Sequence, residues 1–273
     1  IINVPHSNGM DPSEFYQVFL QQDELLECDI LHVHHPKYLL FSECIRAKKI
    51  VLTHHGFYPD MANVRKKYSF FETYVSQYLR SIMDVNEIGF TVYNPIPAKA
   101  YPLLNCEKNN DLLFIGDCNK KVKRLDIALD VAQELNVQLV VAGRANNDLL
   151  NQFAKLSFVT YIGEIDQKTK MDLMSRSKAV ICPNDPPEAF CLVAAEACAV
   201  GTPVLASNNG GLPEVIKHGL NGFICNNMED YLDYYGKICS LEPQTIRSTL
   251  INNFDVGKIT HDYCDLFRLL LMR

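Results

Sequence analysis

Two acidic residues, Glu188 and Glu196, frame an apolar stretch that follows a proline-rich loop, PNDPPEAFCLVAAE at 183–196. Glu188 lies at the expected start of a helix, where backbone N–H groups can receive an anion such as a diphosphate. Glu196 lies about two turns into the helix, where a carboxylate is costly unless it meets donors such as sugar hydroxyls. The types and spacing of this pair suit the binding of a sugar phosphate.

A structural explanation of the same two residues also remains open. Glu188 can complement the helix dipole as a first-turn carboxylate, and Glu196 can be ion-paired. The two residues alone do not separate this explanation from sugar binding.

A basic cluster follows an expected strand in FIGDCNKKVKRLD at 114–126, and it contains Lys120, Lys121, Lys123 and Arg124. Such a cluster can be a solvated helix entry. In a chain with a formal charge of −6, basic groups beside the carboxyl end of a strand can equally form a local anion site. Both interpretations remain open.

Five histidines gather near two expected strand ends, at His32, His34, His35, His54 and His55. Zinc binding is a minor alternative, because the spacing repeats no standard site and no Cys or carboxylate completes a ligand set. His32 and His34 alternate as strand residues do, and we expect both to be packed and satisfied.

Strands and helices alternate from Asp111 onward, which predicts a doubly wound α/β domain with parallel strands. In such sheets ligands bind at the carboxyl ends of the strands. The expected strands are 112–116, 137–143, 158–163, 179–183 and 203–207, and the expected helices are 123–136, 147–156, 166–177, 189–201 and 211–219.

The first hundred residues repeat this pattern less completely, with expected strands at 29–34, 49–55 and 87–94. The prolines in Asn94-Pro95-Ile96-Pro97 block a helix and predict a domain boundary. A mixed basic and aromatic stretch at 64–79 is expected to pack in the first domain through Tyr68, Phe71 and Tyr78; peripheral membrane contact is the minor alternative. Residues 255–273 predict an amphipathic helix.

The composition is that of an ordinary globular chain of 273 residues, which excludes disorder, collagen and coiled coil. No apolar run approaches the roughly 18 residues needed to span a bilayer, and the opening residues do not have the pattern of a secretory signal. Ten cysteines without a CxxC spacing predict reduced core thiols and a cytoplasmic protein. The acidic balance argues against nucleic acid as a partner.

Linked motifs surround the acidic pair. After Glu188 and Glu196, an E-x7-E pair, come Cys198-x-x-Gly201-Thr202-Pro203-Val204, Gly210-Gly211-x-Pro213-Glu214-Val215 and Gly219-x-x-Gly222-Phe223. This sequence closely resembles the C-terminal domain of retaining GT-B-fold glycosyltransferases of the family 4 type (glycosyl transferases group 1). The detailed resemblance covers about 112–227, and a looser one reaches back to Asp29.

The resemblance implies the fold class α/β, GT-B, with two Rossmann-like domains whose parallel sheets face a cleft. The implied domains are a reduced N-terminal acceptor-side domain (1–97), a nucleotide-sugar-binding domain (98–253) and a C-terminal helix packing back on the N-terminal domain (254–273). The implied enzyme is a retaining hexosyltransferase (EC 2.4 class). It moves sugar from a nucleotide-diphosphate sugar to a hydroxyl of a glycan, lipid-linked or small-molecule acceptor.

The resemblance also implies roles for individual residues. Glu188 would contact donor-sugar hydroxyls and, with His55 and Lys123, form the catalytic set. Glu196 would hold the ribose, and the backbone amides after Phe190 would face the phosphates. The remaining donor-binding positions are Cys191, Leu192, Val193, Gly143, Arg144, Tyr161, Gly163 and Arg124.

Three departures from the family pattern support a non-catalytic nucleotide-sugar-binding homologue as the alternative. Asp117 stands where the family has an Arg, with Lys120 or Lys121 as its expected compensation, and Ala189 and Cys191 replace glycines. A nucleotide-sugar epimerase is a weaker alternative, since the E-x7-E pair followed by A-x-G-T-P argues against it. No metal or other cofactor is implied, because no Asp-x-Asp motif lies beside the donor site.

Overall fold

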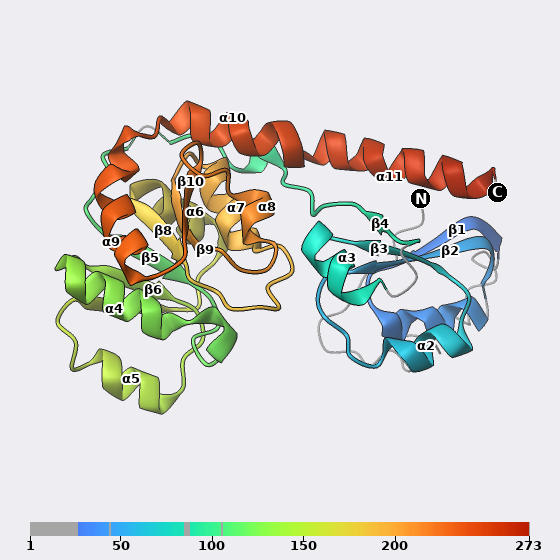
Figure 1. The fold of residues 1–273 in the computed structure, drawn as a ribbon, viewed down its shortest axis with the longest axis horizontal. Coiled ribbons are helices and arrows are strands. Elements are labelled where there is room, and N and C mark those ends of the chain that lie inside the picture. Colours follow the sequence, from blue (N-terminus) through green and yellow to red (C-terminus); the bar gives the residue numbers. More distant parts are fainter. Residues whose placement is uncertain (1–26, 44, 85–87, 105, 273) are drawn as a thin grey trace.

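The computed structural model describes residues 27–43, 45–84, 88–104 and 106–272. The chain forms two domains, each built on a parallel sheet, and a long C-terminal helix runs from the second domain back over the first (Figure 1). The predicted α/β class with two parallel-sheet domains is confirmed.

The N-terminal domain has a four-stranded sheet in the order β1-β2-β3-β4, in which every pair of neighbours is parallel. Its elements are β1 (Glu27–Val33), the 3₁₀ helix η2 (Pro36–Glu43), β2 (Arg46–His54), α2 (Met61–Lys67), β3 (Phe71–Tyr74), α3 (Gln77–Met83) and β4 (Phe90–Thr91). β3 was not predicted, because its aromatic sequence FETY lies inside the basic and aromatic stretch at 64–79. Tyr68 and Phe71 of this stretch pack against core residues, as expected.

The C-terminal domain has a six-stranded parallel sheet in the order β10-β9-β8-β5-β6-β7. Its strands are β5 (Leu112–Ile115), β6 (Leu139–Ala142), β7 (Val159–Gly163), β8 (Ala179–Cys182), β9 (Val204–Ser207) and β10 (Gly222–Cys225). Its helices are η3 (Ala98–Ala100), η4 (Lys121–Lys123), α4 (Leu125–Leu135), α5 (Asn147–Phe153), α6 (Gln167–Arg176), α7 (Leu192–Ala199), α8 (Leu212–Val215), α9 (Met228–Lys237), η5 (Ile238–Ser240) and α10 (Pro243–Phe254).

All five strands predicted from Asp111 onward are present, and so are the five predicted helices. The helix predicted at 211–219 is the short α8, because Ile216 takes an extended conformation with φ −95° and ψ 120°. β10 was not predicted, and it lies at the sheet edge where a Cβ on Gly222 would come within 2.3 Å of Val204 O. The central strands β8 and β9 are buried at every residue, as expected for a sheet covered on both faces.

The chain passes between the two domains twice, once at the proline-rich linker around Ile96 and once between α10 and α11 (Val256–Leu271). These two crossings lie side by side. Ile96 of the proline-rich linker donates its N–H to Phe254 O at 2.7 Å and accepts from Val256 N at 3.2 Å. Beyond the second crossing, α11 buries Ile259, Leu266 and Leu270 in a cluster that includes residues of β2. The last helix therefore belongs by packing to the N-terminal domain (Figure 1).

Nine cysteines are described, and all of them are free thiols. Five are buried, at Cys118, Cys182, Cys191, Cys198 and Cys225. Cys239 and Cys264 are exposed, contrary to the expectation of core thiols. In the described parts of the chain, no helix has both the length and the apolar character to cross a membrane.

Candidate functional site

The carboxyl edges of the two sheets face each other. Gln77 and Tyr78, which follow β3, donate their backbone N–H groups to Glu214, which lies on α8 after β9. Tyr93, which follows β4, packs its ring 6.3 Å from that of Phe190. Both contacts join segments that follow the strands at their carboxyl ends, the edge at which parallel sheets bind ligands.

Three donors converge on the Glu188 carboxylate. Lys123 Nζ donates to Oε2 at 2.6 Å, Asn184 Nδ2 donates to the same oxygen at 2.7 Å, and the Cys191 backbone N–H donates to Oε1 at 3.2 Å. Burial opposes the charge on Lys123, but the adjacent Glu188 outweighs it and holds the lysine pKa above its ordinary value. Lys123 is therefore cationic at the carboxyl ends of β5 and β8.

The start of α7 provides backbone donors beside this cluster. The first helical hydrogen bond runs from Ala195 N to Cys191 O at 3.3 Å, so the N–H groups of Leu192, Val193 and Ala194 precede the first bonded turn. Leu192 is exposed, whereas the Phe190 ring is buried against Tyr93 and Phe254. The backbone N–H groups at the start of α7 can thus bind an anion. The Phe190 side chain packs in the core instead.

Cys191 stands in the left-handed region, with φ 68° and ψ 79°. Glycine adopts this conformation readily, whereas a residue with a Cβ does so at a cost. A glycine would adopt this turn without that cost, whereas the cysteine keeps it under strain.

Two glycines hold the backbone that carries Glu188. A Cβ on Gly210 would lie 2.3 Å from Glu188 O, and one on Gly211 would lie 2.3 Å from Ala189 O. The Gly211 N–H donates to Glu188 O at 2.8 Å. The Gly-Gly pair therefore allows the loop before α8 to lie directly against the segment before α7.

Asp117, which occupies the family's arginine position, is paired with Arg144, whose NH2 lies 3.0 Å from Oδ2. Hydrogen bonds from Asn119 and the nearby Arg144 lower the pKa of Asp117. The sequence predicts that Lys120 or Lys121 offsets this carboxylate; the ion-pair partner is Arg144, and the charge of Lys120 also helps to lower the pKa of Asp117. The Arg144 guanidinium comes from the loop after β6, whereas Lys120 and Lys121 follow β5.

Arg124 pairs with two carboxylates other than Glu188. Its guanidinium donates to Asp126 at 2.8 Å and to Asp185 at 3.0 Å. Of the two basic residues predicted at this position, Lys123 is the one that the structure brings to Glu188.

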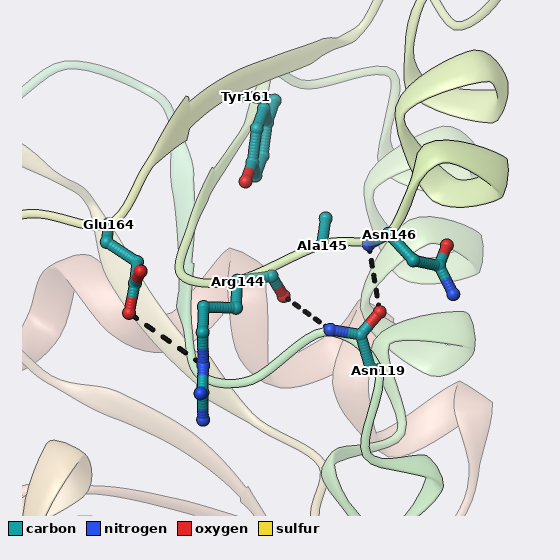
Figure 2. Close-up of a pocket in the computed structure, with 6 residues that line it drawn as sticks. All are labelled: Asn119, Arg144, Ala145, Asn146, Tyr161 and Glu164. Atoms are coloured by element: carbon teal, nitrogen blue, oxygen red, sulfur yellow. Dashed lines mark hydrogen bonds and ion pairs between the residues drawn. The ribbon is translucent and has the colours of Figure 1, made fainter. Parts of the chain in front are cut away.

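A pocket of about 600 Å³ lies beside the loops after β6 and β7 (Figure 2). Asn119, which follows β5, binds the loop after β6: its Nδ2 donates to Arg144 O at 3.3 Å and its Oδ1 accepts from Asn146 N at 2.9 Å. Its lining residues are Asn119, Arg144, Ala145, Asn146, Tyr161 and Glu164. The pocket has the size of small-molecule sites, and its lining includes Arg144 and Tyr161, two of the predicted donor-binding residues.

Gly143 and Gly163 shape this pocket through their backbones. Gly143 has φ 130°, and a Cβ there would lie 1.8 Å from Gly116 O. Its N–H donates to Gly163 O at 2.7 Å, and its own carbonyl accepts from the Tyr161 hydroxyl at 2.8 Å. These contacts fix the loop that carries Arg144.

Glu196 has protein partners on both oxygens. Lys170 Nζ of α6 lies 2.7 Å from Oε2, and the Tyr101 hydroxyl donates to Oε1 at 2.7 Å. Burial and the adjacent Glu196 raise the pKa of Tyr101 to about 12. The ion-paired alternative for Glu196 is thus present in the structure, although a carboxylate can accept further bonds.

The histidines lie at the carboxyl ends of β1 and β2. His34 Nδ1 is 2.8 Å from His55 Nε2, and His32 Nε2 is 2.7 Å from Thr53 Oγ1. Burial, helped by the neighbouring histidines, lowers the pKa of His32 to about 3 and that of His55 to about 4. His32 is packed as expected, but His34 is exposed and is the partner of His55. Among the residues that the structure describes, no His, Cys, Asp or Glu cluster can hold a metal ion.

Several partners in this site were not named from the sequence. They are Asn184 beside Glu188, Lys170 and Tyr101 beside Glu196, and Asn119 in the pocket. None belongs to a recognisable motif, and their partners are between 4 and 95 positions away in the chain.

Comparison with curated proteins gives partial matches. The chain is 34% identical over 119 residues to an uncharacterized glycosyltransferase of Methanocaldococcus jannaschii, covering 41% of this chain and 30% of that protein. It is 30% identical over 126 residues to the lipopolysaccharide 1,2-N-acetylglucosaminetransferase of Salmonella typhimurium, covering 44% and 28%. The chain therefore spans under a third of the length of these relatives.

Solved structures match over most of the chain. Anabaena HepE in complex with UDP aligns with a TM-score of 0.76 at 17% identity, covering 94% of this chain and 81% of that one. A glycosyltransferase from Rickettsia africae aligns with a TM-score of 0.76 at 18% identity, covering 99% and 84%. These likenesses show that the fold is GT-B.

The family is shown by a separate match. Residues 100–248 match the family described as glycosyl transferases group 1. This match covers more than half of the 273 residues and includes Lys123, Glu188 and Glu196. The chain belongs to the glycosyl transferases group 1 family.

Proposed function

We propose that this protein is a glycosyltransferase that moves a hexose from a nucleotide-diphosphate sugar to a hydroxyl acceptor with retention at the anomeric carbon. The observation that carries the proposal is the convergence of Lys123, Asn184 and the α7 backbone on Glu188. A cation, a helix N-terminus and a carboxylate at one sheet edge offer partners both for a diphosphate and for sugar hydroxyls.

In this proposal Lys123 and the N–H groups at the start of α7 bind the donor diphosphate. They stabilise the negative charge that develops on the leaving phosphate as the glycosidic bond breaks. These groups already lie at one sheet edge before the donor arrives, and Lys123 exchanges Glu188 for the phosphate when the donor binds. Lys123 and the amides then take the place of a divalent metal, and we propose that no metal or other cofactor is required.

Glu188 exchanges its present donors for the hydroxyls of the donor sugar. The leaving diphosphate acts as base toward the acceptor hydroxyl on the same face of the sugar, which gives retention. The pocket lined by Arg144 and Tyr161 takes the base, and Glu196 takes the ribose. His55 is assigned to the sugar or acceptor, because its loop leaves the carboxyl end of β2 at the sheet edge facing the other domain.

The relatives support this assignment of partners. HepE was solved with UDP and with UDP-glucose, and the Salmonella relative is named for transfer to lipopolysaccharide. We propose a nucleotide-sugar donor and a glycan, lipid-linked or small-molecule acceptor, without nucleic acid. The free thiols fit a cytoplasmic location, and a contact at the inner membrane face through residues 64–79 is the minor alternative.

The second candidate is a nucleotide-sugar-binding homologue without turnover, and it is favoured by Cys191. The cysteine side chain stands at a left-handed position where glycine would let the donor approach the backbone. An epimerase remains the weakest candidate.

Incubation with a panel of labelled nucleotide sugars, with and without hydroxyl acceptors, separates the candidates. The proposal predicts a glycosylated product whose anomeric proton coupling matches that of the donor. Inverted configuration would contradict retention. Tight binding with neither transfer nor slow hydrolysis would favour the binding homologue.

A further inference from the structure

Glu214 joins the two domains through the start of α3. Its Oε2 accepts from Gln77 N at 2.8 Å, and its Oε1 accepts from Tyr78 N at 2.8 Å. The Tyr93 hydroxyl also donates to Oε2, at 2.9 Å. One carboxylate on α8 thus receives three hydrogen bonds from the N-terminal domain and the linker.

These contacts complete the N-terminal cap of α3. Ser76 Oγ accepts from Leu79 N at 2.9 Å, and Ser76 O accepts from Arg80 N at 3.1 Å. The two N–H groups left over in the first turn, those of Gln77 and Tyr78, are the ones bonded to Glu214. A carboxylate at a helix N-terminus is also favoured by the helix dipole, so the other domain supplies the missing part of the cap.

The same segment is attached to the proposed catalytic residue. The Glu214 N–H donates to Gly211 O at 3.1 Å, and the Gly211 N–H donates to Glu188 O at 2.8 Å. Gly210 and Gly211 lie too close to the backbone at 188–189 for a side chain to fit. The loop before α8 therefore lies in direct contact with the backbone at 188–189, so α8 cannot move toward that backbone.

We propose that Glu214 is a positioning residue that holds the two domains closed and sets the place of Glu188 through the Gly210–Gly211 loop. The claim that Glu214 sets the place of a catalytic residue rests on the proposed function. Its structural part, the closed arrangement of the domains, is independent of any activity.

The strength of the contact suits a reversible closure. Gln77 is exposed, and Tyr78 and Glu214 are half-buried, so water can replace their hydrogen bonds when the domains open. The remaining advantage of the closed form is that of hydrogen bonds to a charged group, an equilibrium factor of about ten or more. Such a factor biases the protein toward closure and still allows substrates to enter.

Gln77→Pro removes one donor without removing the helix. Gln77 is the first residue of α3, a position that proline favours. The preceding Ser76 is extended at φ −158° and ψ 160°, as a residue before proline prefers. Gln77→Ala is the matched control, because it keeps the backbone N–H and loses only the side chain.

The experiment compares Gln77→Pro and Glu214→Gln with Gln77→Ala and with Glu229→Gln, an exposed carboxylate on α9. Small-angle scattering of each full-length protein reports the separation of the domains, and thermal unfolding confirms that each variant folds. Transfer kinetics and calorimetry with a nucleoside diphosphate are measured on the same samples.

We expect Gln77→Pro and Glu214→Gln to raise the radius of gyration and to lower kcat/KM about ten-fold, with the affinity for the diphosphate unchanged. The double variant should be no worse than the more severe single one, since both remove the same contact. An unchanged radius of gyration in both variants would overturn the inference. A wild-type protein that transfers no sugar, but opens on these substitutions, would refute the proposed function and leave the closure standing.

Discussion

Lys170 Nζ lies 2.7 Å from Glu196 Oε2, and both side chains are largely buried. This ion pair joins α6 to α7 beside the site proposed for the ribose. It means that Glu196 has a structural partner whether or not it also binds the nucleoside.

Substitutions on the two sides of this pair separate the structural role from the binding role. We expect Lys170→Met to lower the free energy of unfolding by about 3 kcal/mol, because it leaves a buried carboxylate without its cation. The affinity for a nucleoside diphosphate should remain. Glu196→Gln should lower that affinity about ten-fold, through loss of charged hydrogen bonds to the ribose hydroxyls.

Urea unfolding and calorimetry measure the two effects on the same samples. Wild-type affinity in both variants would leave Glu196 with a structural role alone.

The sequence predicted the C-terminal domain well because its strands are short β-branched or apolar runs with helices between them. It could not predict β3, since Phe71–Tyr74 is short and aromatic and follows a basic helix without a clear turn residue. It also overestimated the length of α8, because the extended conformation of Ile216 depends on packing.

The candidate site was predictable where the chemistry is carried by a motif. Glu188 and Lys123 were both named, and the structure brings them together although they are 65 positions apart. The partners Lys170 and Tyr101 could not be predicted, because a single lysine or tyrosine outside a motif does not indicate which distant carboxylate it meets. The sequence predicts Arg144 as a donor-binding residue, but its pairing with Asp117 depends on how two loops meet.

The lowered pKa of His32, about 3, predicts a loss of stability in acid. The folded protein resists protonation of this half-buried ring, whereas the unfolded chain accepts a proton near the ordinary value of 6.5. The contribution of the neutral ring is therefore complete above pH 6.5 and is lost as the pH falls toward 3, with a slope of at most about 1.4 kcal/mol per pH unit.

Urea unfolding between pH 7 and pH 4 checks this prediction. His32→Asn removes the titrating ring, so its stability should fall less steeply with acid than that of the wild type. Parallel pH curves for the two proteins would contradict the assignment to His32.

Cys191 offers a test of backbone strain at the start of α7. Cys191→Gly and Cys191→Ala both remove the thiol, but only glycine relieves the left-handed conformation at φ 68°. We expect the glycine variant to be more stable than the alanine variant by about 1 kcal/mol. It should also have a lower KM for the donor, because the backbone becomes more accessible.

Thermal unfolding and donor titration measure both effects in one series. Equal melting temperatures for the two variants would show that the turn is not strained by the side chain.

The packing of α11 on the N-terminal domain can be tested with two leucines of the same helix. Leu266 is 5% exposed and Leu269 is 40% exposed. Leu266→Ala should lower the free energy of unfolding by about 2–4 kcal/mol, since it leaves a cavity against β2. Leu269→Ala should change it by less than about 1 kcal/mol. Denaturant unfolding gives both values, and similar losses would argue against the buried contact.

The most direct test of the account is turnover of a nucleotide sugar by wild-type protein and by Glu188→Gln. We expect the wild type to release nucleoside diphosphate as it transfers the sugar, and the variant to be at least about 100-fold slower while it still folds and binds the diphosphate. A wild-type rate in Glu188→Gln would contradict the central role given to the Glu188 and Lys123 cluster.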